Sequence, residues 1–359
     1  MKPSSKITLK KRAQMAEFRH DPVHRRWVIV TVDRVRGPED YQVPQRVSDE
    51  GLCPFCEGQE AKTPPEIYAV RPEGKPDTSG WKVRVFPNRY PAISGEPDSD
   101  SFVERRAYGL YDWASGVGSH DIIVDHPQHH VLFHQMGPDH LAVLLDTYRR
   151  RLGELIQDRR FRYVLAYKNH GITAGASVNH QHTQVLAMPV IPRIAAMALA
   201  SAREHFHLKE RCLFCDLLIQ EVEEGSRVVA GNEHFICYLP YASRFPFEMC
   251  ILPRKHNHDF TTIGDELIRP CAEIINEAMN RLAALFGDTP FNITIHTAPN
   301  AGQVPKRANY WKTLPHDWHW HIEIIPRLTP VAGFEWGTGM FINHTPPEDA
   351  ALFLRNVEL

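Results

Sequence analysis

The same order of cysteines and histidines occurs twice along this chain. Each copy begins with a Cys-x-x-Cys pair, continues with histidines in the middle, and ends with a His-x-His pair. The first copy consists of Cys53, Cys56, His129 with His130, and His180 with His182. The second consists of Cys212, Cys215, His256 with His258, and His319 with His321. Such a recurring order indicates an internal duplication, and 359 residues are long for one core, so we expect two related halves.

Each half contains strand-like runs and one long amphipathic stretch. Short apolar runs at 120–124, 183–188 and 319–325 are typical of strands, whereas 141–156 and 268–285 repeat apolar residues at helical spacing. Several strands with only one long helix per half favour an antiparallel α+β arrangement over a doubly wound parallel sheet.

The chain therefore divides into four expected segments. Residues 1–18 begin with basic residues that lack apolar periodicity, and we expect a disordered tail there. Residues 19–193 and 212–359 should form the two domains, and 194–211 should connect them.

The overall charge excludes some classes of function. The net charge of −2 gives no bulk attraction to nucleic acid or to an anionic membrane, so any bound anion must be held locally. The apolar runs are too short to span a bilayer, and no secretory segment is visible. We expect a cytoplasmic protein that binds neither nucleic acid nor membrane.

The two Cys-x-x-Cys pairs can be zinc half-sites, redox dithiols or disulfides. A cytosolic setting disfavours disulfides, and Pro54 sits differently from the proline of thioredoxin-type dithiols. Zinc is therefore the favoured interpretation. The single cysteines Cys237, Cys250 and Cys271 lie in apolar stretches and are expected in the core.

His180, His182 and Gln184 should share one face of a strand, because alternate residues of a strand point the same way. An isolated His-x-His is more often a pair of core histidines. Here the preceding Ser177, Gln184 and the matched cysteines favour a site, since buried polar groups need partners.

The two copies differ in their flanking residues. Only the first has Gly171, Gly175 and Ser177 before its His-x-His pair, in a loop that can approach phosphate oxygens closely. We therefore assign catalysis to the first half. If one histidine of the pair completes a zinc site, the other is free to attack phosphorus, and we favour His182 as that nucleophile.

Taken together, the motifs resemble the galactose-1-phosphate uridylyltransferase family of the histidine-triad superfamily, whose members include plant-type ADP-glucose phosphorylases. The resemblance runs from about Arg19 to the C-terminus. It rests on Phe18-Arg-His-Asp-Pro, Cys53-Pro-Phe-Cys56, the segment 82–88, Asn169-His-Gly171, the segment 177–184 and His319-Trp-His321.

The resemblance implies two tandem histidine-triad-like domains, each an antiparallel half-barrel with a long helix, and commonly a homodimer. It also implies ping-pong exchange of a nucleoside monophosphate between a nucleotide sugar and a sugar 1-phosphate.

Roles follow from the resemblance by position. His182 matches the nucleophile and Gln184 the phosphate-stabilising glutamine; Arg34, Asn169 and Ser177 match phosphate contacts, and Asn88 lies in the nucleotide-binding segment.

The first zinc site is matched by Cys53, Cys56, His129 and His180. Cys212, Cys215, His256 and His319 would form a second site, as in plant-type members, where iron is a possible occupant. Spacing alone does not choose between these last two histidines and their neighbours His258 and His321. We interpret the second site as structural, because a closed four-ligand site has no open position.

Three functions remain open at this level. The first is uridylyl transfer between UDP-glucose and a hexose 1-phosphate, in galactose metabolism. The segment 332–339 looks more like the ADP-glucose phosphorylase branch, which makes adenylyl transfer from ADP-glucose the alternative. A non-catalytic zinc module that binds nucleotides is the alternative from another class.

Overall fold

A computed structural model describes residues 16–43, 52–95, 103–303 and 311–359. Residues 1–15 of the expected tail lie outside the described residues, and Glu17 and Phe18 already belong to strand β1 (Glu17–Asp21).

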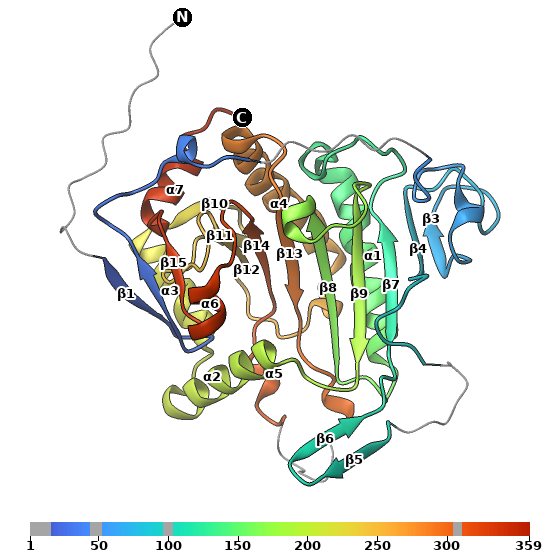
Figure 1. Cartoon of the computed structure of the whole chain (residues 1–359), viewed down its shortest axis with the longest axis horizontal. Helices are drawn as coiled ribbons and strands as arrows, with labels where there is room; N and C mark the ends of the chain where they lie inside the picture. Colours follow the sequence, from blue (N-terminus) through green and yellow to red (C-terminus); the bar gives the residue numbers. More distant parts are fainter. Residues whose placement is uncertain (1–15, 44–51, 96–102, 304–310) are drawn as a thin grey trace, which may run out of the picture.

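Ten antiparallel strands form one continuous sheet across both halves (Figure 1). The strands of the first half are β3 (Tyr68–Val70), β4 (Val83–Pro87), β7 (Ser119–Val124), β8 (Tyr163–His170) and β9 (His182–Met188). Those of the second half are β10 (Val228–Gly231), β11 (Phe235–Tyr238), β12 (Met249–Pro253), β13 (Phe291–His296) and β14 (His321–Pro326). The predicted antiparallel α+β class is confirmed.

The strand order reflects the duplication. From the centre outward the first half reads β8-β9-β7-β4-β3 and the second reads β13-β14-β12-β11-β10, so each strand has a counterpart. The halves meet where β8 pairs with β13, from Phe291 opposite His170 to Ile295 opposite Ala166. The two half-sheets thus merge through backbone hydrogen bonds.

One long helix from each half covers the same face of this sheet. These helices are α1 (Gly137–Ile156) and α4 (Asp265–Phe286), and their buried apolar residues form one core with alternate residues of both half-sheets. The two predicted amphipathic helices are therefore confirmed. Within the described ranges no helix combines the length and the apolar character that a membrane crossing requires.

Two further helices were not predicted. Helix α2 (Arg193–Lys209) occupies the segment that we expected to be a simple connection, and α3 (Leu213–Glu224) follows it. Both pack on the opposite face of the second half-sheet, against Ile236, Tyr238 and Leu252. The division into domains at 19–193 and 212–359 stays a prediction.

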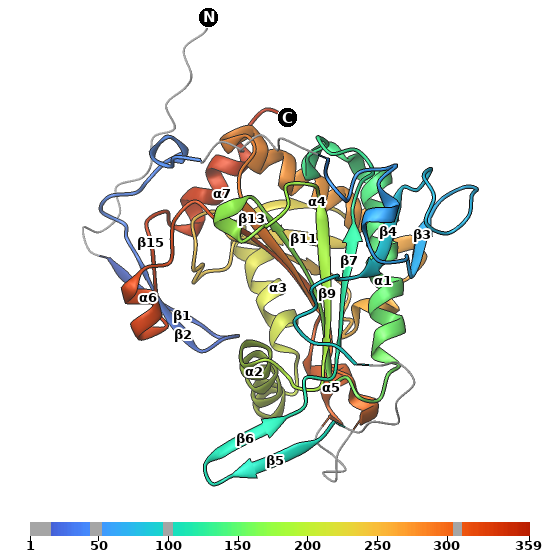
Figure 2. The same cartoon turned by 45° about the vertical axis from the view of Figure 1, so that its right-hand side comes forward.

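The remaining elements lie at the edges (Figure 2). Strands β1, β2 (Arg26–Val30) and β15 (Phe341–Asn343) form a separate three-stranded sheet beside the second half, and β5 (Arg105–Tyr108) with β6 (Tyr111–Ala114) forms an isolated hairpin. The short helices are α5 (Leu314–Asp317), α6 (Gly333–Thr338) and α7 (Pro347–Arg355), and 3-10 turns occur at Pro38–Asp40, Glu60–Lys62, Phe133–Gln135, Ile172–Ala174, Phe260–Thr262 and Ala301–Gln303. Cys237, Cys250 and Cys271 are buried, as expected for core residues.

Candidate functional site

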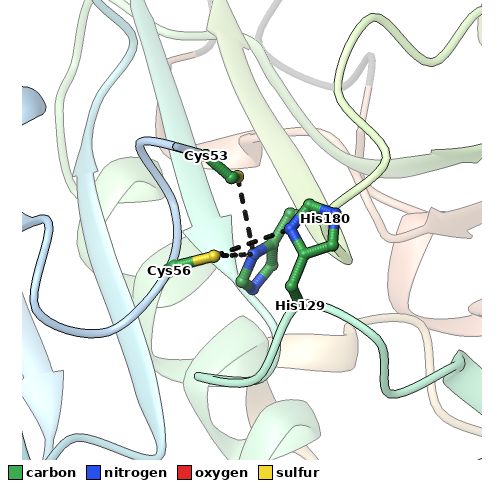
Figure 3. Close-up of side chains that lie close together, drawn as sticks. All are labelled: Cys53, Cys56, His129 and His180. Carbon is green, nitrogen blue, oxygen red and sulfur yellow. Dashed lines mark hydrogen bonds between the residues drawn. The ribbon is translucent and has the colours of Figure 1, made fainter. Parts of the chain in front are cut away.

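Cys53, Cys56, His129 and His180 come together beside the start of β9 (Figure 3). Their potential ligand atoms all lie within 4.8 Å of one another. Cys56 Sγ lies 3.6 Å from the Nδ1 atoms of both His129 and His180, and Cys53 Sγ lies 3.7 Å from His180 Nδ1. A tetrahedral zinc ion separates its nitrogen and sulfur ligands by about 3.6 Å. The donor set therefore fits zinc in chemistry and in spacing.

The imidazole of His180 is prepared to use Nδ1 as a ligand. Its Nε2 donates a hydrogen bond to the carbonyl of His126 at 2.7 Å, which leaves the lone pair on Nδ1. Burial lowers the pKa of His180 to about 4, so the ring is neutral at physiological pH, as a metal ligand must be.

The second half contains an equivalent group made by Cys212, Cys215, His256 and His319. Cys215 Sγ lies 3.4 Å from His256 Nδ1 and 3.7 Å from His319 Nδ1. The Cys212 thiol, together with these two histidines, lowers the pKa of Cys215 to about 3. The structure brings His256 and His319 into this group, and His258 and His321 lie outside it.

The nucleophile candidate His182 differs from His180 in the nitrogen that it leaves free. Its Nδ1 donates to the carbonyl of His180 at 2.8 Å, so the lone pair is on Nε2. Burial lowers the pKa of His182, which favours the neutral, nucleophilic form. Behind it, Lys168 Nζ donates to the His182 carbonyl at 3.2 Å and pairs with Asp125 at 2.7 Å. These contacts hold the start of β9 in place.

His182 lines a cavity of about 580 Å³ on the face of the sheet opposite α1. Four of the expected residues line it: Asn88, Ser177, His182 and Gln184. Sequence reasoning did not single out Leu52, Phe55, Lys62, Phe86 and Ile122 as lining residues. Among the described lining residues, Lys62 and Arg89 are cationic and none is a carboxylate, which suits an anionic ligand.

Two of the expected residues lie elsewhere. Arg34 is exposed in the segment after β2 and does not line this cavity. Asn169 on β8 accepts a hydrogen bond from Asn292 Nδ2 at 2.8 Å, and it joins the two halves near the cavity without lining it. Both assignments as phosphate contacts stay predictions.

The counterpart of His182 in the second half is enclosed. His321 lines a cavity of only about 60 Å³, which the turn between β1 and β2 closes with Asp21, His24 and Arg26. His296 and Glu323 stand close to His321, and Glu323 pairs with Arg244 at 3.1 Å. This closure cannot be predicted from the sequence, because the turn is remote from β14 along the chain.

Two family models match the two parts of the chain. The model described as galactose-1-phosphate uridyl transferase, N-terminal domain, matches residues 5–192, and the C-terminal domain model matches residues 199–350.

Similar proteins cover nearly the whole chain. An ADP-glucose phosphorylase of Arabidopsis thaliana is 32% identical over 96% of this chain and 94% of its own length. A galactose-1-phosphate uridylyltransferase of Thermotoga maritima is 26% identical over 96% of this chain and 99% of its own length. The crystal structure of an Arabidopsis thaliana ADP-glucose phosphorylase with bound ADP-glucose is 31% identical, covers 96% of this chain and 100% of that chain, and has a TM-score of 0.78.

Proposed function

Because the chain belongs to the galactose-1-phosphate uridyl transferase family, we propose that it transfers a nucleoside monophosphate from a nucleotide sugar to a phosphorylated acceptor through His182. The observation that carries this proposal is the free Nε2 of a neutral histidine at the wall of a cavity with cationic and no acidic lining residues among those described.

The reaction proceeds in two displacements. The lone pair of His182 Nε2 attacks the α-phosphorus of the nucleotide sugar, a phosphorus–nitrogen bond forms, and the bond to the bridging oxygen breaks. The sugar 1-phosphate leaves with that electron pair. A phosphate oxygen of the acceptor then attacks the same phosphorus, the phosphorus–nitrogen bond breaks, and its electron pair returns to Nε2 of His182. Together, the two displacements replace one difficult transfer by two easier steps.

The cavity wall stabilises the charge that develops on phosphorus. Gln184 and Asn88 can donate amide hydrogen bonds to phosphoryl oxygens, and the Ser177 hydroxyl lies on the same wall. Gln184 is neutral and cannot readily activate water, which favours transfer over hydrolysis. Cys53, Cys56, His129 and His180 would hold a zinc ion that fixes the turn before His182.

Two donors are supported by different observations. UDP-glucose is supported by the two uridyl transferase models and by the Thermotoga maritima relative, and a hexose 1-phosphate would then be the acceptor. ADP-glucose is supported by the more similar Arabidopsis thaliana relative and by its complex with ADP-glucose. Both donors require the same chemistry at His182.

Homodimerisation also stays a prediction, which multi-angle light scattering tests.

Intact mass after a rapid quench tests the mechanism and the donor together. The purified protein is incubated separately with UDP-glucose and ADP-glucose, alongside His182→Ala. An added mass of one nucleoside monophosphate on the parent, absent from the variant, supports the proposal and identifies the base. The absence of any adduct, in protein whose zinc content is confirmed, contradicts it and favours a nucleotide-binding module.

A further inference from the structure

We infer that His120 is a positioning residue that turns the amide of Gln184 so that its NH2 group faces the cavity. The inference rests on the proposed function, because it gives that NH2 group a phosphoryl oxygen as its partner. His120 is a buried residue of β7, and Gln184 lies on the neighbouring strand β9.

The backbone fixes the tautomer of His120. The N–H of Ala92 lies 3.1 Å from His120 Nδ1 and can only donate, so Nδ1 must carry the lone pair. In a neutral imidazole the proton is then on Nε2. A proton on Nδ1 would point at the Ala92 N–H and leave two donors facing each other.

The protonated Nε2 of His120 in turn fixes the amide of Gln184. It lies 2.8 Å from Gln184 Oε1, and the hydroxyl of Tyr167 donates to the same oxygen at 3.1 Å. Two donors on one oxygen define which end of the amide is the carbonyl. Within the described part of the chain no protein group accepts a hydrogen bond from Gln184 Nε2, and Gln184 lines the cavity.

A second amide follows the same pattern. Asn88 Oδ1 accepts the backbone N–H of Tyr90 at 2.9 Å, so Asn88 Nδ2 is the atom that lies 3.2 Å from His120 Nε2. With His120 protonated on Nε2, this contact joins two donor nitrogens and is not a hydrogen bond. The protons of Asn88 Nδ2 are then left for another acceptor, and Asn88 lines the same cavity.

The orientation matters because phosphoryl oxygens only accept hydrogen bonds. An amide turned the other way would present its carbonyl oxygen to the anion and replace an attraction by a repulsion. By holding Oε1, His120 and Tyr167 keep the donor end of Gln184 toward the phosphorus that His182 attacks. Asn88 is held by the Tyr90 N–H and not by the His120 side chain, so the effect of His120 and Tyr167 on catalysis should pass mainly through Gln184.

The second half contains an equivalent arrangement around Glu323, which can be compared with that around Gln184. Gln184 pairs with Ile122 across β9 and β7, and Glu323 pairs with Cys250 across β14 and β12. His120, two residues before Ile122, therefore corresponds to Glu248, two residues before Cys250. There Arg244 binds both carboxylates, at 2.6 Å from Glu248 and 3.1 Å from Glu323. In each half the side chain at the glutamine or glutamate position is held by donors.

A double-mutant cycle tests the inference. His120→Phe keeps an aromatic ring but removes the donor, and Gln184→Ala removes the amide. The single-turnover rate of adduct formation should fall about tenfold or more in His120→Phe, since losing a preorganised donor has effects of this size or larger. In the Gln184→Ala background the same substitution should change the rate less than about twofold, because independent sites add and coupled sites do not. Tyr167→Phe should show the same coupling with a smaller effect.

The tautomer gives a readout that does not depend on activity. Imidazole 15N shifts of His120, assigned by their loss in His120→Phe, should report a protonated Nε2 and an unprotonated Nδ1. A protonated Nδ1 would overturn the inference, as would a rate loss in His120→Phe that persists undiminished without the Gln184 amide.

If the parent forms no adduct, the proposed function fails, and the tautomer still decides the orientation of Gln184. Should His120→Phe not fold, His120→Gln, which keeps a donor, and Tyr167→Phe complete the comparison.

Discussion

Strands β9 and β14 carry the same pattern on the same scaffold, but in the described part of the chain they line cavities of very different size. Shortly before each strand lies a histidine, His180 or His319, that is grouped with two cysteines. Each strand then begins with a second histidine, His182 or His321, whose Nδ1 donates a hydrogen bond to the carbonyl two residues earlier. The phenylalanine between the two cysteines packs on each of these histidines. The ring centroids of Phe55 and His182 lie 5.3 Å apart, and those of Phe214 and His321 lie 4.9 Å apart.

What separates the two strands is their surroundings. The first faces a cavity of about 580 Å³, whereas α3 and the turn between β1 and β2 leave the second only about 60 Å³. Although burial opposes the ionisation of Glu323, Arg244 and His296 hold its pKa well below the usual value. A fixed carboxylate at this position offers no hydrogen-bond donor to a phosphate, which agrees with the proposal that catalysis belongs to the first half.

We expect the largest difference between the two strands in the rate of adduct formation after the histidine that begins each strand is replaced by alanine. His182→Ala should lower adduct formation by on the order of 10³-fold or more, because the nucleophile itself is lost. His321→Ala, which changes the enclosed counterpart, should leave adduct formation near the parent value. Rapid-quench mass spectrometry measures both. Equal losses in the two variants would break the assignment of catalysis to the first half.

Substitutions at Gln184 and at Glu323, each two residues after the second histidine of a His-x-His pair, test the role of charge. Gln184→Glu should fold, because His120 and Tyr167 can donate to a carboxylate, but it should lower the transfer rate about 10²-fold by replacing a donor with an anion. Glu323→Gln leaves Arg244 without one of its partners and should destabilise the fold by about 3 kcal/mol. Stopped-flow kinetics and urea unfolding give the two values. A fully active Gln184→Glu would contradict the proposed electrostatic role.

Loss of one metal ligand should separate the two Cys/His groups. Cys56→Ser and Cys215→Ser should each reduce the zinc or iron content by about one equivalent per chain, as measured by plasma mass spectrometry. Cys56→Ser should also slow transfer about 10- to 100-fold, because the turn before His182 loses its anchor. Cys215→Ser should lower the Tm and leave the rate of the folded protein unchanged. A transfer rate that falls only in Cys215→Ser would reverse the roles of the two groups.

The smallest expected difference concerns the two aromatic rings. Phe214 is buried among α2, α3 and the second half-sheet, so Phe214→Leu should destabilise the protein by about 1 kcal/mol. Phe55 is only partly buried and lines the cavity, so Phe55→Leu should instead raise the KM for the nucleotide sugar a few-fold. Thermal unfolding and steady-state kinetics distinguish these results. Equal destabilisation by both changes would indicate that the first cavity is part of the core.

The sequence predicted the parts of this protein that depend on local rules. Alternation along a strand and helical spacing of apolar residues located β9, β14, α1 and α4, because these patterns act within one segment. The sequence does not predict helix α2, because the residues that it buries are mostly alanine and serine, which give a weak apolar pattern. The repeated order of cysteines and histidines also indicated two groups, and the structure brings four such residues together in each half.

Contacts between distant segments determined the features that the sequence did not predict. Only the folded chain chose His256 over His258, merged the half-sheets through β8 and β13, and closed the second cavity with the turn between β1 and β2. The partnership of His120 and Gln184 joins residues 64 positions apart and depends on strand register. Residue types and their order thus indicated which side chains could hold a metal ion or attack phosphorus, whereas packing and register determined which half has a large cavity with donors on its wall.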